Sequence, residues 1–103
     1  VSLLDDEALV RKYLQRFKED MPLLLQQIRT AWDAEQWSEI SIHAHIYKSQ
    51  MQYLNEKEAA DIAFELEKKS VALSPVKAEF EILISRLEVH LKYTLEEIRK
   101  IIE

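Results

Sequence analysis

The sequence predicts an all-α fold, an antiparallel four-helix bundle with an additional N-terminal helix. Apolar residues recur every three to four positions along the chain, and no segment alternates long enough to form a strand. The two prolines, Pro22 and Pro75, stand at breaks between amphipathic segments. At 103 residues the chain can build one hydrophobic core but not two, so residues 1–103 are expected to form a single domain. Because the chain starts at Val1 rather than methionine, we expect this domain to be part of a longer protein.

The first helix is expected over about residues 5–20. Asp20-Met21-Pro22 is interpreted as a break and restart, because aspartate caps helices and proline is tolerated in a first turn. A second helix then runs to about Glu35. The apolar sides are formed by Leu9, Tyr13 or Leu14, and Phe17 in the first helix and by Leu24, Leu25, Ile28, Ala31 and Trp32 in the second.

The third helix is expected from Trp37 or Ser38 to about Leu54. Asn55 and Glu58 are spaced as a capping box that opens a fourth helix. Ser74-Pro75 supplies a cap and a first-turn proline for a long last helix. Its near-heptad stripe could form a coiled coil, but the shorter helices need a partner surface, which favours a bundle. The apolar stripes are Ala59, Ile62, Ala63, Leu66 and Leu73 in the fourth helix, and Val76, Phe80, Leu83, Leu87, Leu91, Leu95 and Ile98 in the last.

Composition excludes several classes of function. The chain has no glycine, so it lacks the glycine-rich cradle that binds nucleotide phosphates. It has no cysteine, which removes disulfides, thiolate zinc sites and cysteine nucleophiles. A net charge of -5 argues against a nucleic-acid partner. The chain has no uncharged apolar run of about 18 residues, the length needed to span a membrane. We therefore expect no direct membrane contact and a cytoplasmic location.

The third helix carries the chemistry. Its inward stripe has the spacing 4, 3, 4, 3. On the same helical wheel His45 points away from Tyr47, toward solvent, whereas His43 lies on or beside the buried side. The stripe consists of Ile40, Ala44, Tyr47, Met51 and Leu54.

His45 and Lys48 share one face, one turn apart. A neutral exposed imidazole can attack an activated phosphoryl group, and Lys48 could offset the charge of about -1.5 to -2 that this group brings. Ser41 and Ser49 are small enough to let a partner's active site close over the ring. This pattern indicates a phosphoryl relay rather than an ATP-dependent kinase, although an exposed histidine near a lysine can also be ordinary surface.

Further residues beside His45 leave alternatives open. Ile42, Ile46 and Tyr53 could dock a partner or pack beneath the first helix, and docking is favoured for Ile42 and Tyr53. Gln52 could hydrogen-bond a phosphate oxygen or be simply solvated.

Other patterns point to structure rather than function. His43 and His45 diverge on a helix and cannot chelate one metal ion. Glu39 and His43 have i, i+4 spacing, which is more typical of a structural contact, and His90 has no partner motif. The charged run over residues 65–69 is interpreted as a solvated helical face.

The third helix resembles the histidine-containing phosphotransfer (HPt) domain, whose motif reads roughly Ala-His-x-Leu-Lys-Gly-Ser. Ala44, His45 and Lys48 match it, Tyr47 replaces the usual leucine, and Ser49 replaces the usual glycine. Leu54-Asn55 stands at the usual Leu-Gly, and His43 at a usually apolar position. The resemblance extends to about residue 70 through Phe17, Asp20, Pro22, Leu25, Ile28, Ala31, Trp37, Ile40 and the pair Leu66-Glu67.

The resemblance implies that His45 accepts and donates a phosphoryl group with electrostatic support from Lys48. The implied partners are response-regulator receiver domains, with a covalently linked hybrid histidine kinase as a further possibility. Magnesium would belong to the receiver, so this monomeric domain is expected to hold no cofactor or metal and no carboxylate base. Ser41, Ile42, Ser49, Gln52 and Tyr53 are the expected receiver-docking residues. Two alternatives stay open, a bundle that docks a signalling domain without phosphorylation and a purely structural spacer.

Overall fold

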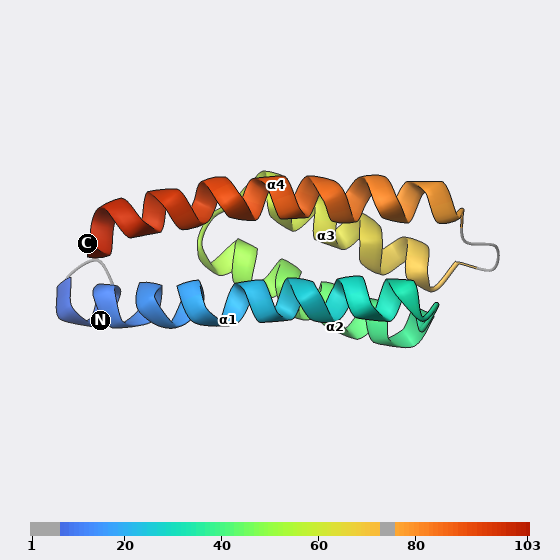
Figure 1. Ribbon diagram of the computed structural model, residues 1–103, viewed down its shortest axis with the longest axis horizontal. Helices are drawn as coiled ribbons and strands as arrows, with labels where there is room; N and C mark the ends of the chain where they lie inside the picture. The colour runs from blue at the N-terminus through green and yellow to red at the C-terminus, as the bar shows by residue number, and fades with distance from the viewer. Residues whose placement is uncertain (1–6, 73–75) are drawn as a thin grey trace.

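The computed structural model describes residues 7–72 and 76–103, and these ranges form four α-helices and no strand (Figure 1). The helices are α1 (Glu7–Asp33), α2 (Trp37–Tyr53), α3 (Lys57–Ser70) and α4 (Lys77–Ile102). α1 packs against α2 and α4, and α3 packs against the same two helices, so the four form a closed ring. The all-helical prediction is confirmed, and none of the described helices is long and apolar enough to cross a membrane.

The predicted break at Asp20-Met21-Pro22 is wrong. α1 continues through Pro22, so the expected first and second helices are one helix and the described residues contain no additional N-terminal helix. Proline in a helix interior removes one backbone hydrogen bond and normally costs about 3 kcal/mol. Here Phe17, Met21 and Leu25 continue one buried stripe past the proline, whose own ring is exposed. Burial of that stripe therefore outweighs the local stop signal.

The predicted capping box at Asn55 and Glu58 is also wrong. Asn55 has a φ of 60°, and α3 begins only at Lys57, without a side-chain cap. The Asn55 amide donates to the carbonyl of Gln52 at 3.0 Å, and the Glu56 amide donates to that of Met51 at 2.8 Å. These two bonds form a Schellman motif that closes α2. Asparagine tolerates the left-handed conformation better than most residues, so Asn55 ends α2 rather than starting α3.

The turn between α1 and α2 uses the same motif with a less suitable residue. Glu35 has a φ of 54°, and the amides of Glu35 and Gln36 donate to the carbonyls of Trp32 and Ala31. Glycine is usual at this position. The chain contains no glycine, and glutamate occupies the position instead. Each tight turn reverses the chain, so α2 runs antiparallel to α1 and α3 runs antiparallel to α2 (Figure 1).

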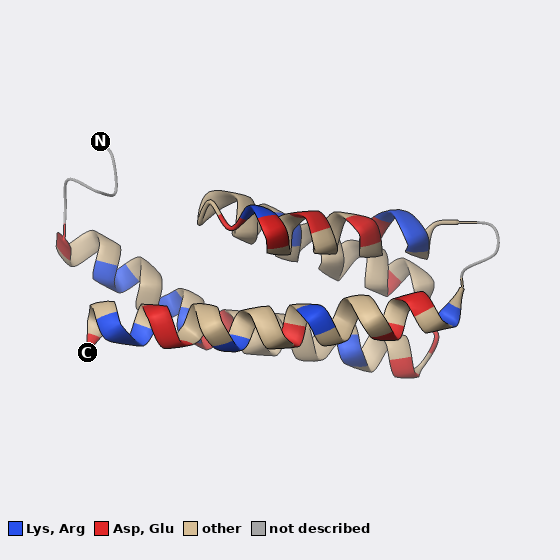
Figure 2. Cartoon of the chain, turned by 90° about the horizontal axis from the view of Figure 1, so that it is seen from above, with Lys and Arg blue, Asp and Glu red and all other residues tan. Residues whose placement is uncertain are grey.

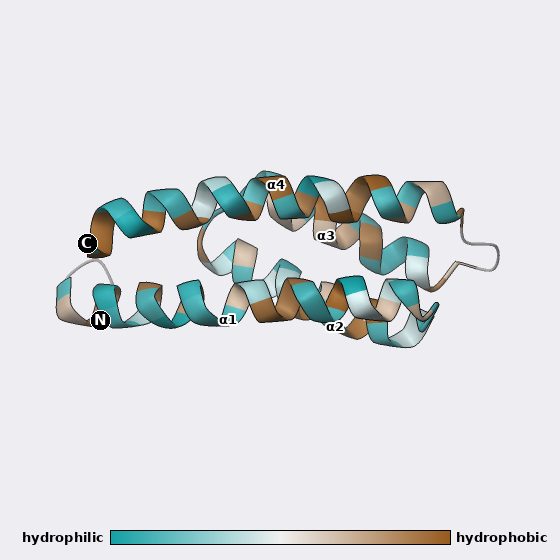
Figure 3. Ribbon diagram, in the orientation of Figure 1, coloured by the Kyte–Doolittle hydropathy of each residue, from teal (hydrophilic) through white to brown (hydrophobic). Residues whose placement is uncertain are grey.

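The buried stripes of the four helices meet along the bundle axis (Figure 3). Most predicted core positions are confirmed, and Leu14 rather than Tyr13 is the buried residue of that pair. Two predictions fail: Leu9 is exposed near the start of α1, and Val76 is exposed because it precedes α4. Leu73, Ser74 and Pro75 lie outside the described residues. The largest fully buried side chains are Met21, Ile28, Ile40, Tyr47, Met51, Leu66, Phe80, Ile84 and Leu87.

Charged residues of both signs are mixed along the helices, and no basic stripe is visible along α4 in Figure 2. One group of ion pairs joins α1 to α4: Arg29 donates to Glu81 and Glu88, at 2.7 Å in each case. The indole of Trp32 donates to the same Glu81 carboxylate at 3.1 Å. These contacts join the two long helices at their exposed edge.

Candidate functional site

α2 presents His45 to solvent, as the helical wheel predicts. Ile40, Ala44, Tyr47 and Met51 are fully buried, whereas the His45 side chain is 58% exposed on the opposite face. Tyr47 is so enclosed that burial raises the pKa of its phenol. The buried stripe therefore holds α2 in one rotational setting, and this setting presents His45 to solvent.

Glu67 of α3 joins His45 and Lys48. One carboxylate oxygen of Glu67, Oε2, lies 2.9 Å from Nδ1 of His45. The other, Oε1, accepts a hydrogen bond from the Lys48 ammonium at 3.0 Å. The three charged or titratable groups thus form one connected cluster between α2 and α3.

The charge of Glu67 determines which ring nitrogen of His45 carries the proton. Burial opposes ionisation of Glu67, but the hydrogen bonds from Lys48 and His45 outweigh it, so the pKa of Glu67 lies below its ordinary value. An ionised carboxylate can only accept hydrogen bonds. Nδ1 of His45 therefore carries the ring proton, and in the neutral ring Nε2 carries the free lone pair.

Lys48 is far less exposed than lysines usually are. Its side chain is only 17% exposed, and its ammonium lies 4.8 Å from the centroid of the Phe64 ring. Lys68 lies over the same ring, also at 4.8 Å. Glu67 and Phe64 thus hold the Lys48 ammonium from two directions.

From the sequence we expected no carboxylate base and did not predict that Glu67 contacts the histidine directly. The interpretation of residues 65–69 as a solvated face holds for Glu65, which pairs with Lys68 at 3.0 Å, but not for Glu67. In the sequence, only the family resemblance at Leu66-Glu67 pointed to this residue. It did not predict that Glu67 of α3 contacts His45 of α2.

The predicted docking residues surround His45 on α2. Ile42, Ser49, Gln52 and Tyr53 are exposed and Ser41 is partly exposed. The Ser49 hydroxyl donates to the backbone carbonyl of His45 at 3.1 Å, so this short side chain does not cover the ring. All five lie on the exposed side of the helix, and their role in docking stays a prediction.

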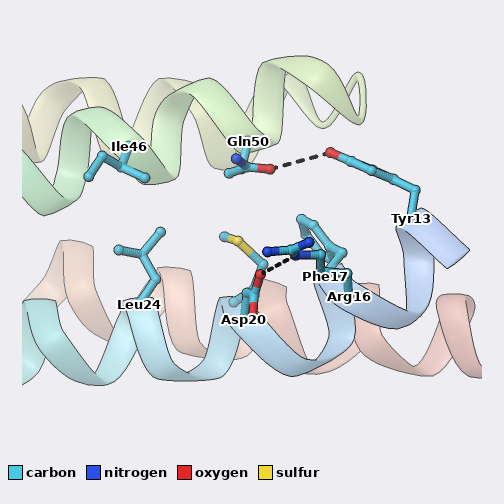
Figure 4. A pocket seen from close by; sticks show the side chains of 8 residues that line it. Tyr13, Arg16, Phe17, Asp20, Leu24, Ile46 and Gln50 are labelled. Atoms are coloured by element: carbon cyan, nitrogen blue, oxygen red, sulfur yellow. Dashed lines mark hydrogen bonds and ion pairs between the residues drawn. The ribbon is translucent and has the colours of Figure 1, made fainter.

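A groove of about 340 Å³ separates α1 from α2 (Figure 4). Leu24 and Ile46 face one another across it, and the Tyr13 hydroxyl donates to Gln50 at 3.3 Å. Tyr13 also contacts the ring of Tyr53, with centroids 4.9 Å apart. Ile46 and Tyr53 thus lie against α1 while remaining exposed, which agrees with the packing alternative; docking of a partner at these residues stays a prediction.

The other two histidines make structural contacts. Nε2 of His43 lies 3.4 Å from Glu39, as the i, i+4 spacing indicates. His90 lies between Glu56 and Thr94, at 3.4 and 3.2 Å. No group of three or more possible metal ligands occurs within residues 7–72 and 76–103.

The fold is a four-helix bundle that exposes the imidazole of His45 beside a lysine and a carboxylate. These features define the class of protein as a helical-bundle module with one exposed reactive histidine. The family comparison is specific: the Hpt domain model matches residues 12–101, and the chain belongs to this family. The match includes α4, which extends the resemblance beyond the first 70 residues. Comparison with curated proteins and with solved structures finds no match. Hpt domains carry out phosphotransfer in two-component phosphorelays and interact with response-regulator receiver domains.

Proposed function

We propose that this domain is a phosphorelay intermediate that accepts a phosphoryl group on His45 from a receiver aspartate and passes it to another receiver. One observation carries the proposal. His45 is exposed, and its Nδ1 lies 2.9 Å from Oε2 of Glu67. Because an ionised carboxylate can only accept a hydrogen bond, Nδ1 carries the ring proton and the nucleophilic lone pair belongs to the other nitrogen. An accessible nucleophile in a fixed tautomer is what an incoming aspartyl phosphate requires.

The transfer balances without a proton transfer. The Nε2 lone pair forms the new bond to phosphorus, and the aspartate carboxylate of the receiver leaves with the electrons of the broken P–O bond. Nδ1 keeps its proton throughout, so the ring becomes a phosphorylated imidazolium beside the Glu67 carboxylate. The negative charge of Glu67 stabilises this cation. The onward step is the reverse, with the aspartate of a second receiver as nucleophile.

Lys48 supports the phosphoryl group electrostatically. It lies one helical turn from His45, and its limited exposure strengthens its interactions with nearby charge. The ammonium would move from Glu67 toward the phosphoryl oxygens as negative charge arrives. Phosphoryl transfer depends mainly on such positioning and charge stabilisation, and the receiver would supply the magnesium ion.

The receiver would dock around the ring. Ser41, Ser49 and Gln52 leave room beside His45, while Ile42 and Tyr53 offer exposed apolar surface. Exposed apolar side chains beside a polar centre resemble the core of a transient interface.

The test is phosphoryl transfer from a phosphorylated receiver domain to the wild-type protein and to His45→Gln. We expect acceptance by the wild type only, as an adduct that is labile in acid and stable in alkali. His43→Gln is the matched control, because it changes the other histidine of α2 and should retain acceptance. If a folded wild-type protein accepts nothing from several receivers, the domain docks partners without carrying the phosphoryl group.

A further inference from the structure

Phe64 is a large aromatic residue that the core does not use. It lies on α3, one turn before Glu67, and its side chain is 44% exposed. Single exposed apolar residues are common and need no explanation. Here, however, two ammonium groups, those of Lys48 and Lys68, each lie 4.8 Å from the ring centroid. Both distances fall within the range of cation–π attraction.

The ring restricts Lys48 in a way that Glu67 alone cannot. A lysine side chain is flexible, and a single ion pair fixes only the end of the chain. The carboxylate of Glu67 contacts the Lys48 ammonium at 3.0 Å, and the Phe64 ring adds a second, apolar contact. The Lys48 ammonium is therefore held close to His45 and is partly shielded from solvent.

The two contacts respond differently when His45 is phosphorylated. The bond to Glu67 is directional and must weaken if Lys48 turns toward the phosphoryl oxygens. The attraction to the ring face is broad, so the ammonium can shift without losing it. The ring can thus stay in contact with Lys48 in both states.

We propose that Phe64 is a positioning residue that keeps Lys48 beside His45 during phosphoryl transfer. This inference rests on the proposed function of His45. Lys68 shares the ring and is tied to Glu65 at 3.0 Å, so a second positive charge remains at the edge of the site.

The experiment uses phosphoramidate, a small phosphoryl donor, so that no receiver has to be chosen. Phosphohistidine formation is followed by intact mass in the wild type, Phe64→Leu and Phe64→Tyr, and again with Lys48→Met added to each. We expect Phe64→Leu to slow formation about two- to fivefold and Phe64→Tyr to restore it. In the Lys48→Met background, Phe64→Leu should have no further effect. Tyr93→Leu is the matched control, since Tyr93 is 64% exposed on α4, and should leave the rate unchanged.

A second readout does not depend on phosphorylation. In the wild type, the aromatic ring should shift the ε-methylene proton signals of Lys48 upfield, and Phe64→Leu should remove that shift. An unchanged rate in Phe64→Leu, or equal slowing with and without Lys48, overturns the role of Phe64 and leaves the proposed function intact. A wild-type protein that shows the shift but never forms phosphohistidine overturns both.

Discussion

At the level of single residues, Glu67 holds the ring proton of His45 on Nδ1. The bond is charge-assisted, because the low pKa of Glu67 keeps its carboxylate ionised. Such a bond fixes the tautomer of the neutral ring. Glu67 is therefore a positioning residue for the proposed nucleophile.

Glu67→Gln tests this role. A glutamine can donate to Nδ1 as well as accept from it, so we expect a mixture of His45 tautomers in long-range proton–nitrogen spectra. Phosphoryl acceptance should slow about fivefold, the difference between a charge-assisted and a neutral hydrogen bond. Asp61→Asn, on the same helix and paired with Lys57, is the control and should change neither reading. An unaltered tautomer in Glu67→Gln would show that the carboxylate does not set it.

The site was only partly predictable from the sequence. His45 and Lys48 lie one turn apart on one helix, and that relation follows from helical geometry alone. Glu67 and Phe64 belong to α3, 16 to 22 positions further along the chain than the α2 residues they contact. Their contacts depend on the register between α2 and α3, which no local pattern reports.

At the level of elements, α1 continues through Pro22 because packing of its buried side outweighs the helix-breaking effect of the proline. Pro22 is exposed and lies in the helix interior, so its ring contributes little burial while its missing N–H weakens the helix. Pro22→Ala should therefore raise the free energy of unfolding by about 1–3 kcal/mol, measured by urea denaturation. Gln26→Ala, one turn further at another exposed position, should change it by less than about 0.5 kcal/mol. A neutral or destabilising Pro22→Ala would mean that α1 has adapted its geometry to the proline.

Helix boundaries were harder to predict than the presence of the helices, because packing can outweigh local start and stop signals. Asp20-Met21-Pro22 carries a valid start signal and Asn55 a valid capping residue. In the fold, Asp20 lies mid-helix and Asn55 adopts a positive φ. Both signals are compatible with more than one local structure. Burial on either side of Pro22 and the tight α2–α3 turn select between them.

At the level of the whole molecule, several carboxylates link bundle stability to pH. The hydrogen bond from Arg29 lowers the pKa of Glu81 at the α1–α4 contact, and Trp32 adds to the effect. Glu67 is shifted in the same direction at the α2–α3 contact. Each group is more easily ionised in the folded chain than its ordinary pKa of 4.5 implies. Acid should therefore weaken both helix contacts.

The sign of this effect can be tested at Glu81. A carboxyl whose pKa is lower in the folded than in the unfolded state stabilises the fold above the unfolded value, and the contribution is lost as the pH falls through the folded value. Glu81→Gln cannot titrate, so the wild type should exceed it in urea midpoint by a constant amount from pH 7 to about pH 5. The difference should then shrink toward pH 3. Glu96→Gln, an exposed change on the same helix, should parallel the wild type throughout. If the difference between wild type and Glu81→Gln stays constant down to pH 3, the contact of Arg29 with Glu81 does not couple stability to pH.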